Sequence, residues 1–229
     1  MTSTSDHVQD SRRTGRLVGR LAWWAAWTGL VLGQIHALSR FATADGREDL
    51  RAPLVRLWAV PASEALRPLL DWSGPDRVYL TYGKIWLPVF AAFTLCAVTT
   101  YRARRPRGAE RWTWRLAITG YLVAVLGVAL DYWTQWGAHP TPFLETAFLV
   151  SIGGLLLTLL GSTALGIALL RGHFRPAASA WLLALCIPIA VAILQVTSLG
   201  NAALPQMFAF ALIGRQFNRP APETDGDTR

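Results

Sequence analysis

Long apolar segments separated by short charged clusters are the feature of this sequence that most constrains its fold. Most of the segments approach the roughly 20 residues that cross a lipid bilayer as a helix. They cover residues 21–38, 85–101, 116–133, 147–170, 178–197 and 201–214. Only 16% of the residues are charged, against about a quarter in soluble domains. The sequence therefore predicts an all-α protein, a polytopic transmembrane helical bundle of about six spans, although the short last segment could instead be re-entrant or interfacial.

The first apolar segment has one alternative interpretation, a cleaved secretory signal. Arg12 and Arg13 precede it, and Ala42 and Ala44 follow it with the spacing of a cleavage site. The segment is longer, however, than the apolar region of a usual signal peptide, and further spans follow. An uncleaved first span is the favoured interpretation.

The domain organisation follows from these segments. Residues 1–18 are polar and are expected to form a flexible cytoplasmic tail, and residues 217–229 a disordered one. Residues 19–216 would then be the transmembrane domain, with a long outer loop at 40–84.

That outer loop mixes apolar and charged residues, and prolines at positions 53, 61 and 68 divide it into short pieces. Such a pattern predicts one or two interfacial helices that lie on the outer membrane surface. The functional alternative is a lid over an external site.

The distribution of basic residues predicts the orientation. With a cytoplasmic N terminus, the inner segments hold 15 of the Lys and Arg residues and the outer ones hold seven. Basic residues favour the cytoplasmic side of a membrane, so we expect a cell-membrane protein with both termini in the cytoplasm. The same topology accounts for the net charge of +8, and no nucleic-acid partner is predicted. The excess of arginine over lysine, 21 to 1, is typical of a GC-rich bacterial genome.

Most tryptophans lie near the ends of the apolar segments, where interfacial aromatic belts are expected. They are Trp23, Trp24, Trp27, Trp86, Trp112, Trp114, Trp133, Trp136 and Trp181.

Small residues recur at every fourth position on two of the segments, which places them on one face of each helix. The first face holds Ala25, Gly29, Gly33 and Ala37, and the second holds Gly154, Thr158, Ser162 and Gly166. Small residues let helix backbones approach closely in lipid. We therefore predict that both faces are helix-packing surfaces. In one arrangement that fits this spacing, the two faces pack against each other.

Polar side chains gather near the outer ends of the segments, whereas the inner halves hold almost no ionisable groups. The candidates for an outer polar site are Gln34, His36, Arg40, Asp131, Glu145 and Gln195. Ionisable groups at membrane depth are costly and are therefore functional candidates by default. The alternative is that each side chain reaches the headgroup layer separately and hydrogen-bonds to water.

Motifs for cofactors and catalysis are absent from the sequence. The four histidines include no pair at facing positions that could hold haem, and no metal, nucleophile or phosphate-loop motif occurs. Cys96 and Cys186 are expected to pack as small apolar residues. No cofactor or metal site is predicted, and whether the chain is an enzyme stays open.

Two functional hypotheses follow. The favoured one is a non-catalytic accessory or assembly component that acts through helix contacts, in a complex with another membrane protein or as a homo-oligomer. The alternative is a transporter, or a protein that binds a lipid or small solute, with a polar site in the outer half of the bundle. The second hypothesis requires the candidate polar side chains to meet at one cavity.

Overall fold

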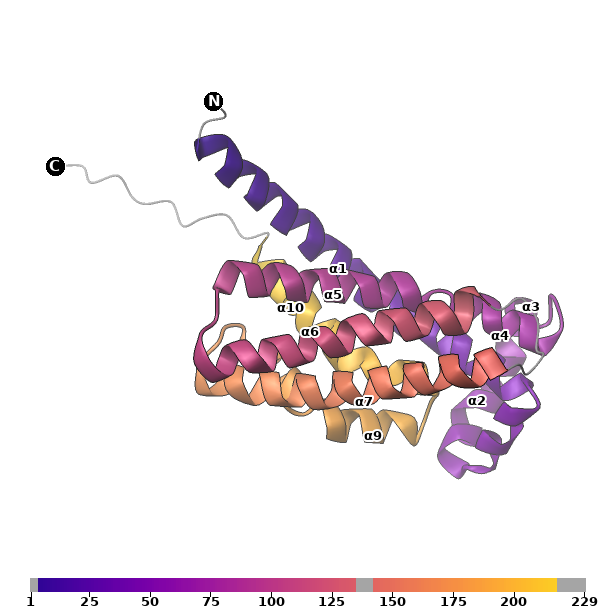
Figure 1. The fold of residues 1–229 in the computed structure, drawn as a ribbon. Coiled ribbons are helices and arrows are strands. Elements are labelled where there is room, and N and C mark those ends of the chain that lie inside the picture. Colours follow the sequence, from indigo (N-terminus) through magenta and orange to yellow (C-terminus); the bar gives the residue numbers. More distant parts are fainter. Residues whose placement is uncertain (1–3, 135–141, 218–229) are drawn as a thin grey trace.

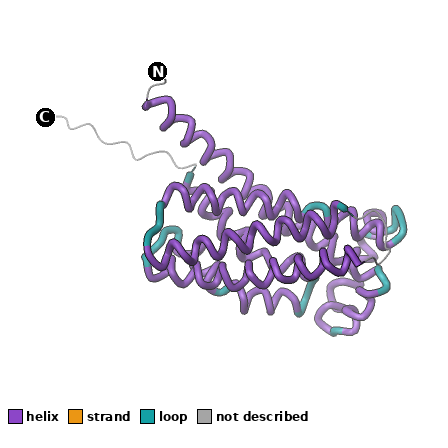
Figure 2. Tube along the Cα trace, in the orientation of Figure 1, coloured by secondary structure: helices purple, strands orange, loops and turns teal. Residues whose placement is uncertain are grey.

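The computed structural model describes residues 4–134 and 142–217, and every regular element in these ranges is a helix (Figure 2). The longer helices are α1 (Thr4–Ala42), α5 (Trp86–Arg104), α6 (Gly108–Val128), α7 (Pro142–Arg171) and α10 (Leu204–Gln216). The shorter ones are α2 (Pro53–Ala65), α3 (Arg67–Leu70), α4 (Pro75–Gly83), α8 (Ala177–Ala184) and α9 (Cys186–Leu194). Two 3₁₀ helices, η1 (Asp45–Arg51) and η3 (Leu199–Ala203), and one π-helix, η2 (Ala129–Trp133), complete the set.

Three of the described helices are long and apolar enough to cross a membrane, namely Pro75–Arg104, Gly108–Trp133 and Glu145–Arg171. A fourth is added if α8 and α9 are one broken span, since they meet at an angle of 61°. Helix α1 falls outside this set, because its apolar segment also holds three tryptophans, a glutamine and a histidine. Helix α10 is only 13 residues long. The prediction of six spans therefore remains a prediction.

The long helices lie side by side, with α2, α3 and α4 gathered at one end of the bundle (Figure 1). Helix α6 packs against α7, and α1 packs against α10, α5 and α4. The N-terminal part of α1 leaves the bundle. Helix α1 begins at Thr4, so residues 4–18 are helical where the sequence predicts a flexible tail. Most of the predicted tail at 217–229 lies outside the described residues.

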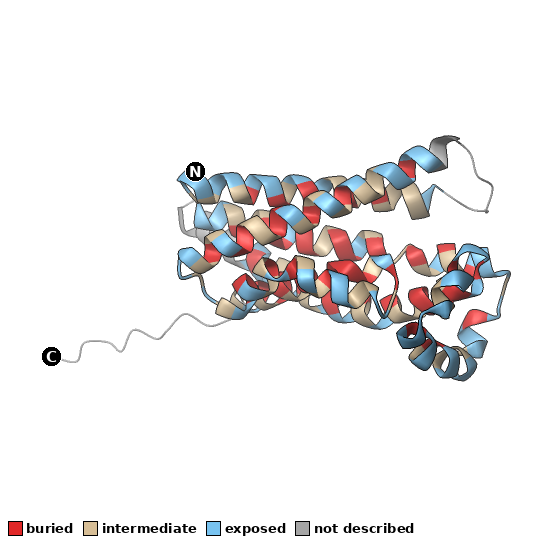
Figure 3. Cartoon of the chain, turned by 90° about the horizontal axis from the view of Figure 1, so that it is seen from below, coloured by how far each residue is buried: buried red, intermediate tan, exposed pale blue. Residues whose placement is uncertain are grey.

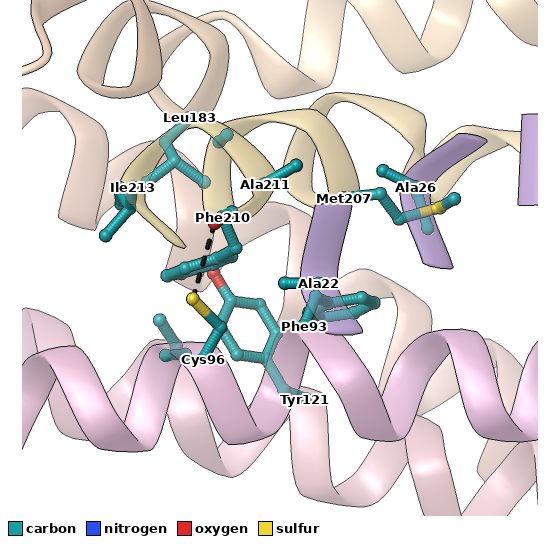
Figure 4. Packing of buried hydrophobic residues seen from close by; sticks show 14 of the residues in the cluster. Ala22, Ala26, Phe93, Cys96, Tyr121, Leu183, Met207, Phe210, Ala211 and Ile213 are labelled. Carbon is teal, nitrogen blue, oxygen red and sulfur yellow. Dashed lines mark hydrogen bonds between the residues drawn. The ribbon is translucent and has the colours of Figure 1, made fainter. Parts of the chain in front are cut away.

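Aromatic rings fill the centre of the bundle (Figure 4). Phe93 and Phe210 each meet the ring of Tyr121 edge-on, with ring centroids 5.3 and 5.6 Å apart. The Tyr121 hydroxyl lies 2.8 Å from Ser162 Oγ, and the Cys96 thiol donates to the Phe210 carbonyl at 3.3 Å. The three rings come from α5, α6 and α10, and Ser162 belongs to α7. This cluster therefore holds α5, α6, α7 and α10 together.

The small-residue faces pack within the chain, but not against each other. A side-chain carbon on Gly33 would lie 2.8 Å from the Trp86 ring, and one on Gly29 would collide with Met207. A carbon on Gly154 would lie 2.8 Å from the Ala124 nitrogen, and one on Gly166 2.6 Å from the Ala184 Cα. The face on α1 thus contacts α5 and α10, whereas the face on α7, including the buried Thr158 and Ser162, lies against α6 and α8.

The apolar segment at 178–197 is not one straight helix. Helix α8 ends at Ala184 and α9 begins at Cys186. Pro188 has no backbone N–H, and its ring would clash with the carbonyl four residues earlier, which belongs to Ala184. The break therefore lies where this proline requires it.

The segment 40–84, which is predicted to be an outer loop, is mostly helical, and α4 continues into α5 as part of the helix Pro75–Arg104. Helices α2 and α3 cover the C-terminal end of α1 through a second core of Ala37, Leu38, Phe41, Val55, Ala59 and Leu70. The Trp58 indole also donates to the Val196 carbonyl at 2.6 Å. These contacts fix α2 against both α1 and the end of α9.

Buried residues face the interior, while the outer faces of the helices are exposed (Figure 3). Many of the exposed side chains are large and apolar, including Leu122 and Leu126 on α6 and Leu149, Leu156 and Leu160 on α7. Trp86 and Trp114, in contrast, are buried, so these two do not belong to an exposed aromatic belt.

Candidate ligand-binding cavity

A cavity of about 610 Å³ lies at the end of the bundle where α1 and α6 end and α5 and α7 begin. This volume is within the range of sites for small molecules. Elements η1, α2, α4, η2, α9 and η3 complete its walls. We call this end of the molecule the cavity end.

His36, near the C-terminal end of α1, is the most buried titratable group of the cavity wall, at 1% exposed. The Trp86 indole donates to His36 Nδ1 at 3.1 Å. An indole N–H only donates, so Nδ1 carries no proton and the ring is neutral, with its hydrogen on Nε2. Within the described residues, Nε2 has no hydrogen-bond partner. The histidine therefore holds an unused N–H donor within the wall of the cavity.

Two tyrosines fix the His36 ring. Tyr79 on α4 stacks on it, with ring centroids 4.7 Å apart and an interplanar angle of 19°. Tyr132 on η2 meets it edge-on at 5.4 Å, and the two tyrosine hydroxyls lie 3.0 Å apart. Because Tyr132 sits on the π-helical turn at the end of α6, this irregular turn brings it to the histidine. Such turns are frequent at functional sites.

Arg40 and η1 form the rim of the cavity. Arg40 Nε donates to Asp49 Oδ2 at 3.1 Å, and about a third of the arginine side chain is exposed. The Thr43 hydroxyl donates to the Arg40 carbonyl and accepts from the Gly46 N–H, at 2.7 and 3.2 Å. These hydrogen bonds turn the chain directly after α1, and the turn places Asp45 and Asp49 at the rim of the cavity.

Further hydroxyls line the cavity without using their hydrogen-bonding capacity inside the protein. Ser151 on α7 and Ser198 before η3 both contribute to the wall. As with His36 Nε2, neither Oγ has a partner among the described residues. A buried polar group without a partner is costly, so these three groups of the wall are the ones that would gain most from a hydrogen-bond partner.

The structure brings four of the six polar candidates to this cavity. His36, Arg40, Asp131 and Gln195 line it. The other two lie elsewhere. Gln34 accepts from the Thr197 hydroxyl at 3.4 Å and lines a separate hollow beside α2 and α9, and Glu145 is exposed at the start of α7.

Sequence reasoning missed the aromatic part of the wall, which consists of Phe41, Tyr79, Trp86, Phe90, Tyr132 and Phe148. Tyr79 lies in the predicted outer loop, outside the apolar segments, and Trp86 was assigned to the interfacial aromatic belt. Several of these aromatic residues lie near the same segment ends as the polar candidates, and this shared position could have indicated them. Among the residues that the structure describes, no group of three or more His, Cys, Asp or Glu side chains could hold a metal ion.

Comparisons of the chain with protein families, with characterised proteins and with solved structures find no match. The geometry of the cavity is therefore the basis for any functional argument.

Proposed function

We propose that this chain is a multi-pass membrane protein that binds a small amphiphilic molecule in the cavity at the outer end of its helical bundle. In this proposal both termini are cytoplasmic, and α2 and α3 lie at the outer surface of the cell membrane. The observation that carries the proposal is the meeting of His36, Arg40, Asp131 and Gln195 from three separate parts of the chain at one cavity.

The arrangement of the helix ends supports the membrane topology. The basic-residue count assigns to the outside one end each of α1, α5, α6, α7 and α9, and all five contribute to the cavity wall. It also assigns the start of the segment 201–214 to the outside, where η3 contributes Leu199 and Gly200 to the wall. The exposed leucines on α6 and α7 would face lipid, since a soluble monomer rarely exposes so large an apolar surface. Helices α2 and α3 leave Leu54, Leu57 and Leu69 exposed, as helices at a membrane surface do.

The composition of the wall supports an amphiphilic ligand. The charged side chains of Arg40, Asp45 and Asp49 lie at the rim, whereas Phe90 and Ala124 are almost fully buried. Small-molecule sites commonly combine an apolar wall with a few polar groups that orient the ligand.

The accessory or assembly role receives less support from the structure. Its motivation was the pair of small-residue faces, and both are occupied by helices of the same chain. They are therefore not free surfaces for a partner, and their presence is explained by packing within the monomer.

Native mass spectrometry of the full chain tests the proposal. We expect the wild-type protein, released from gentle detergent, to retain a small molecule. Gln195→Trp, at an exposed position of the cavity wall, should block the site and lose it. Glu145→Trp, exposed but outside the wall, is the matched control and should retain it. A chain that emerges bare in all three cases, or equal occupancy in all three, would contradict the proposal.

A further inference from the structure

We infer that the cavity takes an organic cation, an ammonium group on an apolar body that also carries an acceptor oxygen. This inference rests on the function proposed above and adds the chemical class of the ligand. Three independent features of the wall lead to it: its charge, its aromatic rings and its unused donors.

The charged side chains that line the cavity are predominantly acidic. Arg40 contributes one positive charge, whereas Asp45, Asp49 and Asp131 contribute three negative ones, so the formal sum is −2. Arg40 is already paired with Asp49 at 3.1 Å. His36 adds no charge, because its Nδ1 accepts from Trp86. The net field at the mouth therefore favours a cation over an anion.

Aromatic rings make up much of the remaining wall, with six Phe, Tyr and Trp side chains around the cavity. The faces of such rings carry partial negative charge and attract ammonium groups, and the attraction grows when the cation is removed from water. Carboxylates combined with aromatic rings recognise alkylated ammonium groups, because the rings also contact the alkyl substituents. The same wall offers an anion only one guanidinium, which is already bound to a carboxylate.

The unused donors specify a second part of the ligand. His36 Nε2–H and the hydroxyls of Ser151 and Ser198 lie at the wall without partners among the described residues. A donor of this kind is satisfied by a hydroxyl, ester or ether oxygen. Asp45 and Gln195 are exposed, whereas Phe90 and Ala124 are buried. We therefore place the ammonium near the mouth and the apolar body toward the interior of the bundle.

The charge preference is testable by thiol labelling at Ser198→Cys, a nearly isosteric change at the wall, with Thr81→Cys as the exposed reference outside it. Neither native cysteine lines the cavity, so the wild type provides the blank. Two methanethiosulfonate reagents are compared, one trimethylammonium-ethyl and one sulfonatoethyl. We expect the ratio of their rates at position 198, divided by the ratio at position 81, to be about ten.

Neutralising the acids of the wall identifies the source of this preference. Asp45→Asn combined with Asp131→Asn should reduce the normalised ratio severalfold. Asp71→Asn combined with Asp76→Asn removes two acids that do not line the cavity and should leave it unchanged. A normalised ratio of one or below would overturn the cation inference. If the neutral methyl reagent labels Ser198→Cys no faster than the wild type, the cavity is not reached, and the proposed function fails as well.

Ligand protection separates recognition of charge from recognition of shape. Choline and its neutral isostere 3,3-dimethylbutan-1-ol are each tested for slowing the labelling of Ser198→Cys by the neutral reagent. We expect choline to act at a concentration about tenfold lower, and equal potency would overturn the inference. Protection in phosphatidylcholine nanodiscs without added choline, but not in phosphatidylglycerol nanodiscs, would assign the ammonium group to a lipid headgroup. Protection by added choline alone would assign it to a free solute.

Discussion

The two ends of the helical bundle are built differently. At the end opposite the cavity, α1 and α10 touch backbone to backbone at Gly19 and Gly214. There Glu110 accepts hydrogen bonds from Arg104 and from the Trp114 indole. At the cavity end, α1, α6 and α7 instead surround a space of about 610 Å³, and His36 retains an unused donor.

This difference separates the residues that hold the fold from those that are available to a ligand. Close contacts and satisfied polar groups stabilise a bundle, whereas a cavity and unpaired donors cost stability and are retained where something binds. The comparison predicts that enlarging a side chain is harmful in the packed region and tolerated at the cavity. It also predicts that removing a charge lowers stability at the end opposite the cavity and changes binding at the cavity end.

The largest effect is expected from Gly166→Leu. A side-chain carbon at this position would lie 2.6 Å from the Ala184 Cα, and backbone cannot give way as a flexible side chain does. Overpacking typically costs about 1–3 kcal/mol and occasionally more, which corresponds to a melting temperature several degrees lower for a chain of this size. The measurement is thermal unfolding of the purified protein in detergent.

Gly153→Leu is the matched control for this variant. Gly153 lies on the same helix and is exposed, with nothing within 4 Å of an added carbon. Its melting temperature should match that of the wild type. An equal loss in both variants would mean that leucine on α7, rather than the contact with α8, is responsible.

The second effect concerns the Glu110 carboxylate at the end opposite the cavity. Glu110→Gln keeps the shape of the side chain and removes the charge that attracts Arg104, in a pair whose side chains are 32% and 23% exposed. We expect a loss of about 1–2 kcal/mol in stability. Asp71→Asn breaks the more exposed pair with Arg67, whose atoms lie 3.6 Å apart, and should cost less than about 0.5 kcal/mol. Equal losses would show that exposure does not separate the two pairs.

The helical architecture could be predicted from the sequence, because each apolar segment is largely helical in the structure. What could not be predicted was where those helices bend or continue. The break before Cys186 depends on Pro188 acting on the carbonyl of Ala184, and the apolar composition of the segment concealed it. The continuation of α4 into α5 was concealed by the charged residues of α4, which faces the cavity through Tyr79.

The candidate site was accessible in part. The criterion of an ionisable residue near the outer end of an apolar segment selected His36 and Asp131, without any knowledge of how the two lie in space. The same criterion also selected Glu145, which points elsewhere, because position along a helix does not fix the direction of a side chain within the bundle. Tyr132 was not selected, because its place at the cavity depends on the π-helical turn of η2, for which the sequence gives no signal.

A smaller effect is expected from filling the cavity. Val128 on α6 lines it and is partly exposed, so Val128→Phe places added volume into existing space. We expect a change in stability of less than about 1 kcal/mol, in contrast to the packed region. The same variant, combined with Ser198→Cys, should label severalfold more slowly with the neutral methanethiosulfonate. Unchanged labelling together with a large loss of stability would mean that the space at Val128 is not continuous with Ser198.

The smallest effect comes from the ion pair at the rim, and it sharpens the comparison most. Arg40→Gln and Asp49→Asn break the same 3.1 Å contact, so any structural consequence of losing that contact is shared by both variants. Their consequences for charge are opposite, because the first makes the formal sum of the wall −3 and the second makes it −1. We expect the concentration of choline that protects Ser198→Cys to fall about two- to threefold in Arg40→Gln and to rise by a similar factor in Asp49→Asn. A shift in the same direction in both variants would mean that the pair supports the shape of the rim. Opposite shifts would mean that the charge of the cavity end, and not merely its open space, determines which ligand it holds.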